Sequence, residues 1–557
     1  MAAAAAYVRS MFQWTVKREG IIAPDERPPA PQSIALGLQH IFAMFGATVL
    51  APILMGFDPN TAIFFSGVGT LIFFVCVRGR VPSYLGSSFS FIAVVLSAEA
   101  IAWGGHGPNF PAALGGIVAC GAVYALIGLI VMAVGYKWIE YLMPPVVTGV
   151  IVMVIGLNLA VTAVNDLKIN NATFNNPNLD TLGVVFGLVT ALAVAVVAVY
   201  APRIIRPLPI LIGGIFGYLF YFLLGNVMSL VPTAAQINFD KVWHAAWIGL
   251  PNFTTPTFDG HAITLIVPVA LVLVAENLGH VKAVAGMTKR DLDPYIGRAF
   301  LGDGIATMIS GAGGGTGVTT YAENIGVMAV TKIYSSLIFV IAALVALCMG
   351  FCPKFGALIQ TIPWPVLGGL AIVLFGLIAA TGGRIWVENK VDFSLNKNLI
   401  TAAAALTMGA GNLTINSGDF SFGGIGTACF GAIILYQILN GFGRRGDDAA
   451  PATAETAGAC PSQIRGGQPK GCPPHYLASS PALPAPLQAY KKAEAVRPPP
   501  FVLPEERLGV NAHGAGGDVM PGPLAGVEGR PDEAEETDQD VACEALDDED
   551  DEADKGH

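Results

Sequence analysis

The sequence predicts an all-α polytopic membrane protein, and its composition, its apolar runs and the placement of its charge each indicate this. The 557 residues are 53% hydrophobic and 13% charged, with a mean hydropathy of +0.60, whereas an average soluble domain is about 25% charged. Apolar runs recur between residues 33 and 440 and are long enough to cross a hydrocarbon core of about 30 Å. The net charge of −10 arises in the tail, because residues 447–557 carry −14 and residues 1–446 carry +4.

Fourteen transmembrane segments account for these runs. They are expected at 33–54, 60–78, 87–104, 112–135, 143–163, 181–200, 207–230, 261–281, 295–310, 316–331, 333–352, 365–381, 396–412 and 423–441. With the N-terminus inside, the inside loops hold thirteen Lys and Arg residues and the outside loops hold only Lys168, Lys241 and Lys354. Cytoplasmic loops carry such an excess of basic residues. We therefore expect a multi-pass protein of the inner membrane, embedded in the lipid bilayer, with both termini in the cytoplasm.

The two halves of the chain repeat each other. Residues 145–149 (PVVTG) match residues 365–369 (PVLGG), and Gly67 and Thr70 match Gly304 and Thr307 in the same order earlier in each half. Two repeats of seven segments follow, and because seven is odd the second repeat must be inverted relative to the first. Many secondary transporters have this architecture, with the binding site at the repeat interface near the bilayer midplane.

The third and tenth segments differ from the others. Residues 86–92 (GSSFSFI) and 315–321 (GTGVTTY) are polar and glycine-rich, and apolar helix follows each. Non-helical backbone at membrane depth is tolerated only where protein or a water-filled cavity satisfies it. We predict short extended strands here that lead into half-helices, whose first-turn N–H donors point at a central site. The alternative is that these glycines only allow close helix packing.

Two carboxylates, Glu276 and Glu323, lie inside segments that otherwise read as membrane-buried. A charged side chain at bilayer depth is costly, so such residues mark substrate or ion pathways by default. His280 lies one helical turn beyond Glu276, and Asp303 lies in the ninth segment. Each has a structural alternative: a hydrogen bond within the core for the two glutamates, helix packing for His280 and a helix cap for Asp303. The constellation predicts a binding site within the membrane.

At these residues the chain resembles the nucleobase–ascorbate transporter family, the nucleobase:cation symporters of the uracil permease kind. Residues 323–332 (ENIGVMAVTK) are similar to the family signature, an acidic or amide residue, then Asn-x-Gly, then Thr and a basic residue. Supporting stretches are 37–49 (GLQHIFAMFGATV), 81–91 (VPSYLGSSFSF) and 275–280 (AENLGH). The likeness covers residues 33–440. Residues 23–27 (APDER) and 283–287 (AVAGM) are most similar to bacterial pyrimidine permeases of the uracil-utilisation type.

The resemblance implies a core domain and a gate domain, built from alternating stretches of the chain, and a homodimer through the gate domains. The expected order is a cytoplasmic N-terminal segment (1–32), a first core stretch with spans 1–4 (33–135), a first gate stretch with spans 5–7 (136–230), an extracytoplasmic loop (231–260), a second core stretch with spans 8–11 (261–352), a second gate stretch with spans 12–14 (353–442) and a tail (443–557). The tail is acidic and rich in Pro, Ala and Gly. Such composition buries too little apolar surface to fold, so we expect a disordered, solvated tail.

The resemblance also implies the residues of a nucleobase site. By similarity, Glu276 and Glu323 hold the ring through its N–H and carbonyl edge. The backbone amides of Phe89 and Ala322 complete the polar contacts, and His280 helps to couple protons. Further expected positions are Tyr321 and Phe375 at the substrate and Gln39, His40, Asp303 and Asn324 in support.

Two of these positions depart from the family pattern, because uracil permeases have glycine at the position of Ala322 and tyrosine at that of Phe375. The methyl group narrows the site, and Phe375 lacks a hydroxyl donor, so both departures bear on the exact ligand more than on its class. Asn324 is expected to brace the tenth segment rather than to touch the ligand. Gln39, which the repeat sets opposite Glu276, forms a second polar cluster with His40.

We predict a secondary active transporter, not an enzyme, that imports uracil or a related pyrimidine by proton symport with elevator-type alternating access. Desolvation and a nearby like charge both disfavour an ionised carboxyl, so Glu276 or Glu323 is expected to carry the coupled proton. The alternatives are a permease for xanthine or urate and, from another class, an anion transporter, which two glutamates oppose on Coulomb grounds. No cofactor, metal or nucleic acid is expected, and the sequence does not distinguish proton from sodium coupling.

Overall fold

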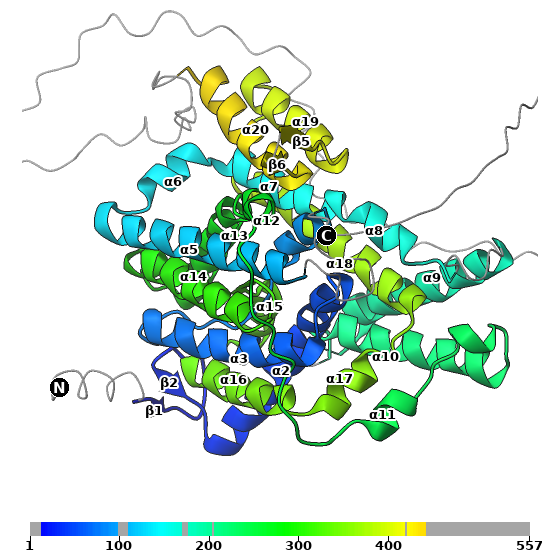
Figure 1. Cartoon of the computed structure of the whole chain (residues 1–557). Coiled ribbons are helices and arrows are strands. Elements are labelled where there is room, and N and C mark those ends of the chain that lie inside the picture. The colour runs from blue at the N-terminus through cyan, green and yellow to red at the C-terminus, as the bar shows by residue number, and fades with distance from the viewer. Residues whose placement is uncertain (1–12, 98–109, 170–176, 203–204, 418–419, 442–557) are drawn as a thin grey trace, which may run out of the picture. The chain divides into compact units, whose positions relative to one another are not determined.

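The computed structural model describes residues 13–97, 110–169, 177–202, 205–417 and 420–441, and helices dominate these stretches of the chain (Figure 1). The prediction of a disordered tail at 443–557, and the end of the predicted third span, 98–104, lie outside the described residues.

The helices follow the predicted segments along the chain. Those of the first half are α2 (Ala30–Leu54), α3 (Pro59–Cys76), α4 (Ile92–Ser97), α5 (Phe110–Val134), α6 (Lys137–Leu142), α7 (Pro145–Asn158), α8 (Ala160–Asn165), α9 (Pro177–Tyr200), α10 (Pro209–Tyr221) and α11 (Asp240–His244). Those of the second half are α12 (Gly260–Ile266), α13 (Val269–Thr288), α14 (Ile296–Ala312), α15 (Ala322–Thr331), α16 (Ser336–Gly350), α17 (Pro353–Ile359), α18 (Trp364–Glu388), α19 (Asn396–Ala410) and α20 (Gly424–Leu439).

Three two-stranded ladders and four short turns of helix complete the described structure. The strands are β1 (Thr15–Val16) with β2 (Glu26–Arg27), β3 (Leu85–Ser87) with β4 (Val318–Thr320), and β5 (Ile415–Ser417) with β6 (Phe420–Phe422). The short turns are η1 (Phe89–Phe91), η2 (Phe222–Val227), η3 (Thr233–Ala235) and η4 (Asp293–Tyr295).

Local signals decide where several helices begin and end. The Asp58 carboxylate accepts a hydrogen bond from the backbone N–H two residues on, and Pro59 then opens α3. Proline also stands at the first position of α7, as Pro145. Its missing N–H costs nothing there, because the first N–H groups of a helix have no intrahelical partner. Lys289 and Lys332 end α13 and α15 in the left-handed conformation, with φ of 53° and 60°.

Eight described helical stretches are long and apolar enough to cross a membrane, and three of them each join two of these elements: α7 with α8, α10 with η2, and α12 with α13. A ninth candidate joins α16 to α17, which is bent from it by 87°. Each predicted span overlaps a described helix or a strand followed by a helix. The sequence did not predict α6, α11 or α17, because helices of five to seven residues are too short to show the apolar length on which spans are recognised. The protein is therefore a mostly helical, multi-pass membrane protein.

The helices pack in two groups. In the first, α5 lies along α14, and α3 packs against both α14 and α16 (Figure 1). In the second, α18 packs against α7 and α9, and α19 packs against α7 and α20. The first group contains segments assigned above to a core domain and the second contains segments assigned to a gate domain. The residue boundaries of those domains stay a prediction.

Glycine allows α5 and α14 to approach closely. A Cβ atom on Gly304 of α14 would lie 2.4 Å from the backbone nitrogen of Ala125. A Cβ on Gly121 of α5 would lie 2.8 Å from the carbonyl oxygen of Gly304, and one on Gly128 would lie 2.5 Å from the backbone nitrogen of Leu301. Small residues at such contacts let helix backbones come together in membranes. This contact places α14, and with it Asp303, behind the candidate site.

Replacing Gly304 by alanine is expected to destabilise the protein. The added methyl group has no room against α5, and overpacking of this kind costs about 1–3 kcal/mol. The melting temperature of the detergent-purified protein, followed by size-exclusion chromatography after heating, should fall below that of the parent. Gly383→Ala is the matched control, because a Cβ there would meet only the end of Met153 at an ordinary 3.4 Å. Equal melting temperatures for the two variants would contradict the prediction.

Candidate functional site

A strand pair joins the two halves of the chain at the candidate site. β3 and β4 pair antiparallel, with Leu85 opposite Thr320, Gly86 opposite Thr319 and Ser87 opposite Val318. All residues of both strands are buried. This ladder satisfies the backbone groups that an extended segment would otherwise leave unpaired at membrane depth. The extended segments predicted in spans 3 and 10 are therefore present, and they bond to each other.

A helix starts directly beyond each strand. η1 and α4 follow β3, and α15 follows β4. Tyr321, the N-cap residue of α15, makes no side-chain capping bond, so the Ala322 N–H at the start of the first turn is available to a ligand. A Cβ on Gly317 would lie 2.1 Å from the Phe91 ring, so only glycine fits where the chain before β4 passes η1. Because the strands are antiparallel, the two half-helices begin at opposite ends of this short ladder.

Glu276 and Glu323 lie on elements that pack against each other. Glu276 is in the middle of α13 and Glu323 is in the first turn of α15, and α13 contacts both α15 and β4. Both side chains are partly exposed, and the two carboxyl groups are close enough to interact electrostatically. Neither has an ion-pair partner among the described residues. The structure thus brings the two predicted carboxylates together at one site.

Small, exposed residues continue the faces that carry these carboxylates. On α13, Gly279, Ala283 and Gly286 are exposed at helical spacing from Glu276. On α15, Ala322 and Gly326 are exposed beside Glu323, and a Cβ added at Gly279, Gly286 or Gly326 would meet no atom within 4 Å. A face that carries Glu276 is unsuited to lipid. These residues therefore mark an open approach to the carboxylates from the ends of α13 and α15.

His280 is bonded to the strand pair. Its Nδ1 lies 2.8 Å from Thr320 Oγ1 on β4, and its ring is partly exposed. The histidine therefore joins α13 to β4 one turn from Glu276. Thr320 bonds the His280 ring through its side-chain hydroxyl and also through its backbone.

His40 and Asn324 lie behind α15 rather than on its exposed face. Both side chains are buried. Asn324 Nδ2 lies 3.0 Å from His40 Nδ1 and donates to the His40 carbonyl oxygen at 3.1 Å, while the His40 ring packs on Phe339. These contacts hold α15 against α2. Gln39, the neighbour of His40, is partly exposed.

Asp303 belongs to a buried polar network behind α13. Asn277 Nδ2 donates to Asp303 Oδ2 at 2.6 Å and lies 2.9 Å from the Tyr124 hydroxyl, which in turn lies 3.4 Å from Asp303 Oδ2. The three side chains are fully buried and tie α13, α14 and α5 together. Sequence reasoning missed Asn277 and Tyr124. The adjacency of Asn277 to Glu276 was a usable signal, whereas a single tyrosine in the apolar α5 resembles an ordinary core residue.

The aromatic candidates are placed differently from one another. Phe89 and Phe375 meet edge to face, with ring centroids 5.9 Å apart, so η1 contacts α18 directly at the site. Tyr321 is buried. Its hydroxyl donates to the Ser87 carbonyl at 2.8 Å and lies 3.1 Å from Thr48 Oγ1. The side chain of Tyr321 therefore braces β3 against α2, and only its backbone lies at the start of α15.

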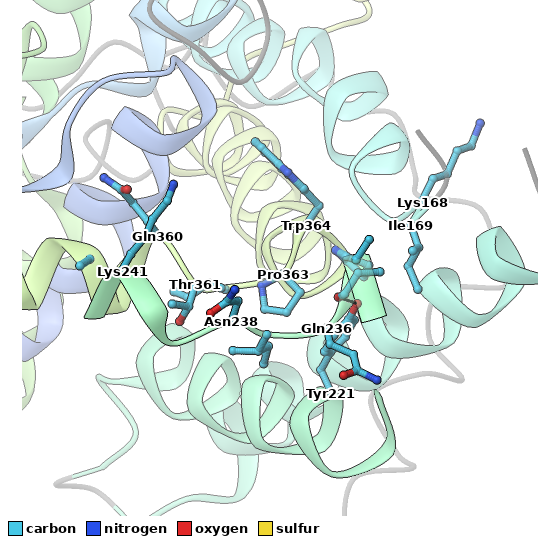
Figure 2. Close-up of a pocket in the computed structure, with 16 residues that line it drawn as sticks. Lys168, Ile169, Tyr221, Gln236, Asn238, Lys241, Gln360, Thr361, Pro363 and Trp364 are labelled. Carbon is cyan, nitrogen blue, oxygen red and sulfur yellow. Dashed lines mark hydrogen bonds between the residues drawn. The ribbon is translucent and has the colours of Figure 1, made fainter. Parts of the chain in front are cut away.

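A separate cavity lies away from the candidate site residues. Figure 2 shows this cavity of about 420 Å³, around Tyr221, Asn238, Pro363 and Trp364. None of the predicted site residues lines it. Among its polar groups, the Tyr221 hydroxyl donates to the carbonyl oxygen of Ala235 at 2.8 Å. The carboxylate site, rather than this cavity, carries the candidate chemistry. In the described ranges no group of three or more His, Cys, Asp and Glu residues is arranged to hold a metal ion.

Comparison with solved structures shows the fold. The transmembrane domain of the cyanobacterial bicarbonate transporter BicA superimposes with a TM-score of 0.51 at 16% identity, covering 72% of this chain and 96% of that one. The murine anion transporter Slc26a9 in its inward-facing state superimposes with a TM-score of 0.52 at 13% identity, covering 74% and 68%. At such low identities the likeness extends to the fold alone.

Comparison of sequences shows the family. A family model described as "Permease family" matches residues 31–418. The chain is 56% identical over 426 residues to the putative pyrimidine permease RutG of Escherichia coli K12, covering 76% of this chain and 93% of RutG. It is 42% identical over 426 residues to a uracil permease of Paenibacillus larvae, covering 76% and 97%. The chain therefore belongs to the nucleobase–ascorbate transporter family, of the uracil permease type, and is a membrane permease rather than an enzyme.

Proposed function

We propose that the protein imports uracil or a closely related pyrimidine by proton symport. The observation that carries this proposal is the pairing of Glu276 and Glu323, both partly exposed, next to the open first turn of α15. Relatives described as pyrimidine and uracil permeases align with this chain over more than nine tenths of their own length. These two lines of support are independent of each other.

The chemistry of the ring suits this arrangement. Uracil is flat and neutral, with two N–H donors and two carbonyl acceptors along its edge. Carboxylates accept from N–H groups in charge-assisted hydrogen bonds, which are roughly twice as strong as neutral ones. The backbone N–H of Ala322 and that of Phe89 offer donors to the carbonyl groups. A ligand that lacks one of these groups leaves a buried partner unpaired, which costs about 1–3 kcal/mol.

The same carboxylates suit proton coupling. Glu276 interacts electrostatically with Glu323 and with the buried Asp303, and three like charges in a desolvated site repel one another. We therefore expect either Glu276 or Glu323, both partly exposed, to bind a proton together with the substrate. We expect His280, one helical turn from Glu276 and bonded to Thr320, to pass that proton on. The likeness to anion transporters does not extend to the ligand, because these carboxylates would repel an anion.

Alternating access would come from movement between core and gate. The protein would have fourteen spans in two inverted repeats. Residues 33–135 and 261–352 would form the core domain, and residues 136–230 and 353–442 would form the gate domain. The edge-to-face contact of Phe89 with Phe375 lies where core and gate would slide. Two copies would pair through their gate domains. The protein would lie in the inner membrane, with both termini in the cytoplasm.

The direction in which the site is open can be measured by cysteine labelling. In Gly326→Cys, a membrane-impermeant maleimide should react, because Gly326 is exposed and has open space around it. We expect reaction from the cytoplasmic side, because α15 ends at Lys332, one of the basic residues that the expected topology places inside. Uracil should protect the new cysteine. Ala343→Cys, which is fully buried on α16, is the matched control and should gain no label over the parent. Labelling of Gly326→Cys from the outer side alone would contradict the expectation that the site opens to the cytoplasm.

The function itself is tested by uptake of radiolabelled uracil into proteoliposomes, with and without an inward proton gradient. Stimulation by the gradient, together with competition by thymine but not by xanthine, supports the proposal. Competition and uptake by xanthine would place the chain with purine permeases. Absence of any nucleobase uptake by folded protein would overturn the proposal.

A further inference from the structure

The N-terminal segment before α2 is folded onto the first group of helices. Residues 14–27, here called the N-terminal strap, form the β1–β2 ladder, in which Thr15 is opposite Glu26 and Val16 is opposite Arg27. Lys17 and Glu26 close the strap on itself through an ion pair of 3.0 Å. β2 contacts α16, and Figure 1 shows both strands beside α3 and α16. The strap includes the 23–27 stretch that the transport site leaves unexplained.

The strap bonds to the chain immediately beyond α15. The Ile22 N–H donates to the Lys332 carbonyl at 3.2 Å, and the Tyr334 N–H donates to the Ile22 carbonyl at 2.8 Å. The Ser336 N–H then donates to the Pro24 carbonyl at 3.1 Å. α15 ends at Thr331 and has only ten residues. A helix this short cannot span the bilayer by itself, so its position depends on what holds its two ends.

Apolar contacts reinforce this attachment. Ile22 is 2% exposed and forms a buried cluster with Ile333 and Ile338. Trp14 donates from its indole nitrogen to Ser336 Oγ at 3.0 Å, and its ring lies 6.1 Å from that of Phe74 on α3. The strap is therefore packed as well as hydrogen-bonded.

Asp25 connects the strap to two further segments, one at the end of α13 and one before β3. Its Oδ1 lies 2.7 Å from Arg290 Nη2, just beyond the end of α13, and its Oδ2 lies 3.9 Å from Arg80 Nη1. Arg80 lies between α3 and β3. Three elements converge on this segment: α13 with Glu276, α15 with Glu323, and the chain that leads to β3 and Phe89. Every predicted hydrogen-bonding partner of the nucleobase is carried by one of these three.

We propose that the N-terminal strap is a positioning element of the nucleobase site, in which Asp25 holds the ends of α13 and α15 in register through Arg290 and the backbone of residues 22–24. Only the identity of the ligand, a nucleobase, rests on the function proposed above. Asp25 is a positioning residue, since its contacts are with Arg290 and Arg80 and not with the nucleobase.

The ionic contact is present throughout the pH range in which transport is measured. Partial burial opposes the charged form of Asp25, but the hydrogen bond and charge of Arg290, with the charge of Arg80, hold the pKa of Asp25 below its ordinary value of 3.8. A carboxyl with a lowered pKa keeps its ion pair above that ordinary value and loses it only as the pH falls through the lowered one. Changes at Asp25 should therefore leave the pH profile of uptake unchanged, whereas changes at Glu276 should alter it.

Hydrogen–deuterium exchange on the purified full chain tests the proposal without reference to any substrate. Asp25→Asn should increase exchange in peptides that cover α15 and the end of α13, because local opening sets the exchange rate. A peptide from α18 should be unchanged. Lys17→Met, which breaks only the ion pair inside the strap, is the matched control and should leave α15 as in the parent. Should Asp25→Asn fail to fold, Arg290→Gln supplies the same measurement.

Uptake kinetics supply the second readout. Asp25→Asn should raise the KM for uracil by about two- to fivefold with little change in the maximal rate. Half-exposed ion pairs contribute little free energy, and their loss corresponds to a change in affinity of about this size. Asp25→Glu should restore the KM of the parent. Unchanged exchange in α15 would overturn the strap proposal, whether or not the KM is raised. If the parent takes up no nucleobase, the proposed function fails, and the exchange result still decides on the strap.

Discussion

Replacing Glu276 by glutamine is expected to lower the initial rate of uracil uptake by about 10- to 100-fold and to remove its stimulation by a proton gradient. Glutamine keeps the shape of the side chain but carries no charge and binds no exchangeable proton. Hydrogen bonds to charged groups contribute about 1.5–3 kcal/mol, and each 1.4 kcal/mol is a factor of about ten in affinity. Glu276 is partly exposed beside Glu323, so its charge is available to the substrate rather than used within the fold.

The measurement is uptake of radiolabelled uracil into proteoliposomes at several external pH values, together with uracil–uracil exchange without a gradient. Exchange that survives in Glu276→Gln while gradient-driven uptake is lost would assign Glu276 to coupling, and loss of both would assign it to binding as well. Glu388→Gln is the matched control, because Glu388 is exposed at the end of α18 and bonds only Arg384 in the described structure. Gradient-driven uptake at the parental rate in Glu276→Gln would make Glu276 a structural residue.

Replacing Gly86 by alanine is expected to abolish most transport activity although it adds a single methyl group. A Cβ on Gly86 would lie 2.5 Å from the Tyr321 ring and 2.6 Å from Thr48 Oγ1. The Tyr321 ring must therefore move, and its hydroxyl then loses the bonds to Ser87 and Thr48. Because Tyr321 is the N-cap residue of α15, this shift displaces Ala322 and Glu323. Overpacking costs about 1–3 kcal/mol, and uptake should fall by at least about tenfold.

Uptake of uracil and the melting temperature of the purified protein check this second prediction together. Gly260→Ala, at the first position of α12 with open space around it, should leave both quantities as in the parent. A folded Gly86→Ala protein with full uptake would show that the strand pair tolerates displacement of Tyr321, and that α15 is positioned by other contacts.

The sequence alone was sufficient for the class of protein and for the location of the strand segments. Recurrent apolar runs were visible, and the glycine-, serine- and threonine-rich stretches near residues 86 and 318 stood out because polar, backbone-permissive residues are rare in membrane spans. The register of β3 on β4 was not visible. It depends on pairing between segments from opposite halves of the chain, and nothing in either segment specifies which residue faces which.

The candidate site was only partly visible, for a related reason. Glu276 and Glu323 were recognisable because ionisable residues at membrane depth are costly and therefore mark function. The direction in which each neighbouring side chain points was not visible. Tyr321 and Glu323 are two residues apart, yet the tyrosine ring is buried against Thr48 whereas the glutamate is partly exposed.

The sequence by itself determined that this protein is a multi-pass membrane permease with two carboxylates in its spans, because hydropathy, charge and motif are properties of consecutive residues. Only the tertiary structure decided which groups meet. It placed His280 on Thr320, bonded Asn277 to Asp303, and folded the N-terminal strap onto the end of α15. These contacts join residues far apart in the chain, and they follow from how helices pack and strands pair in three dimensions, where local sequence patterns carry no information about the partner.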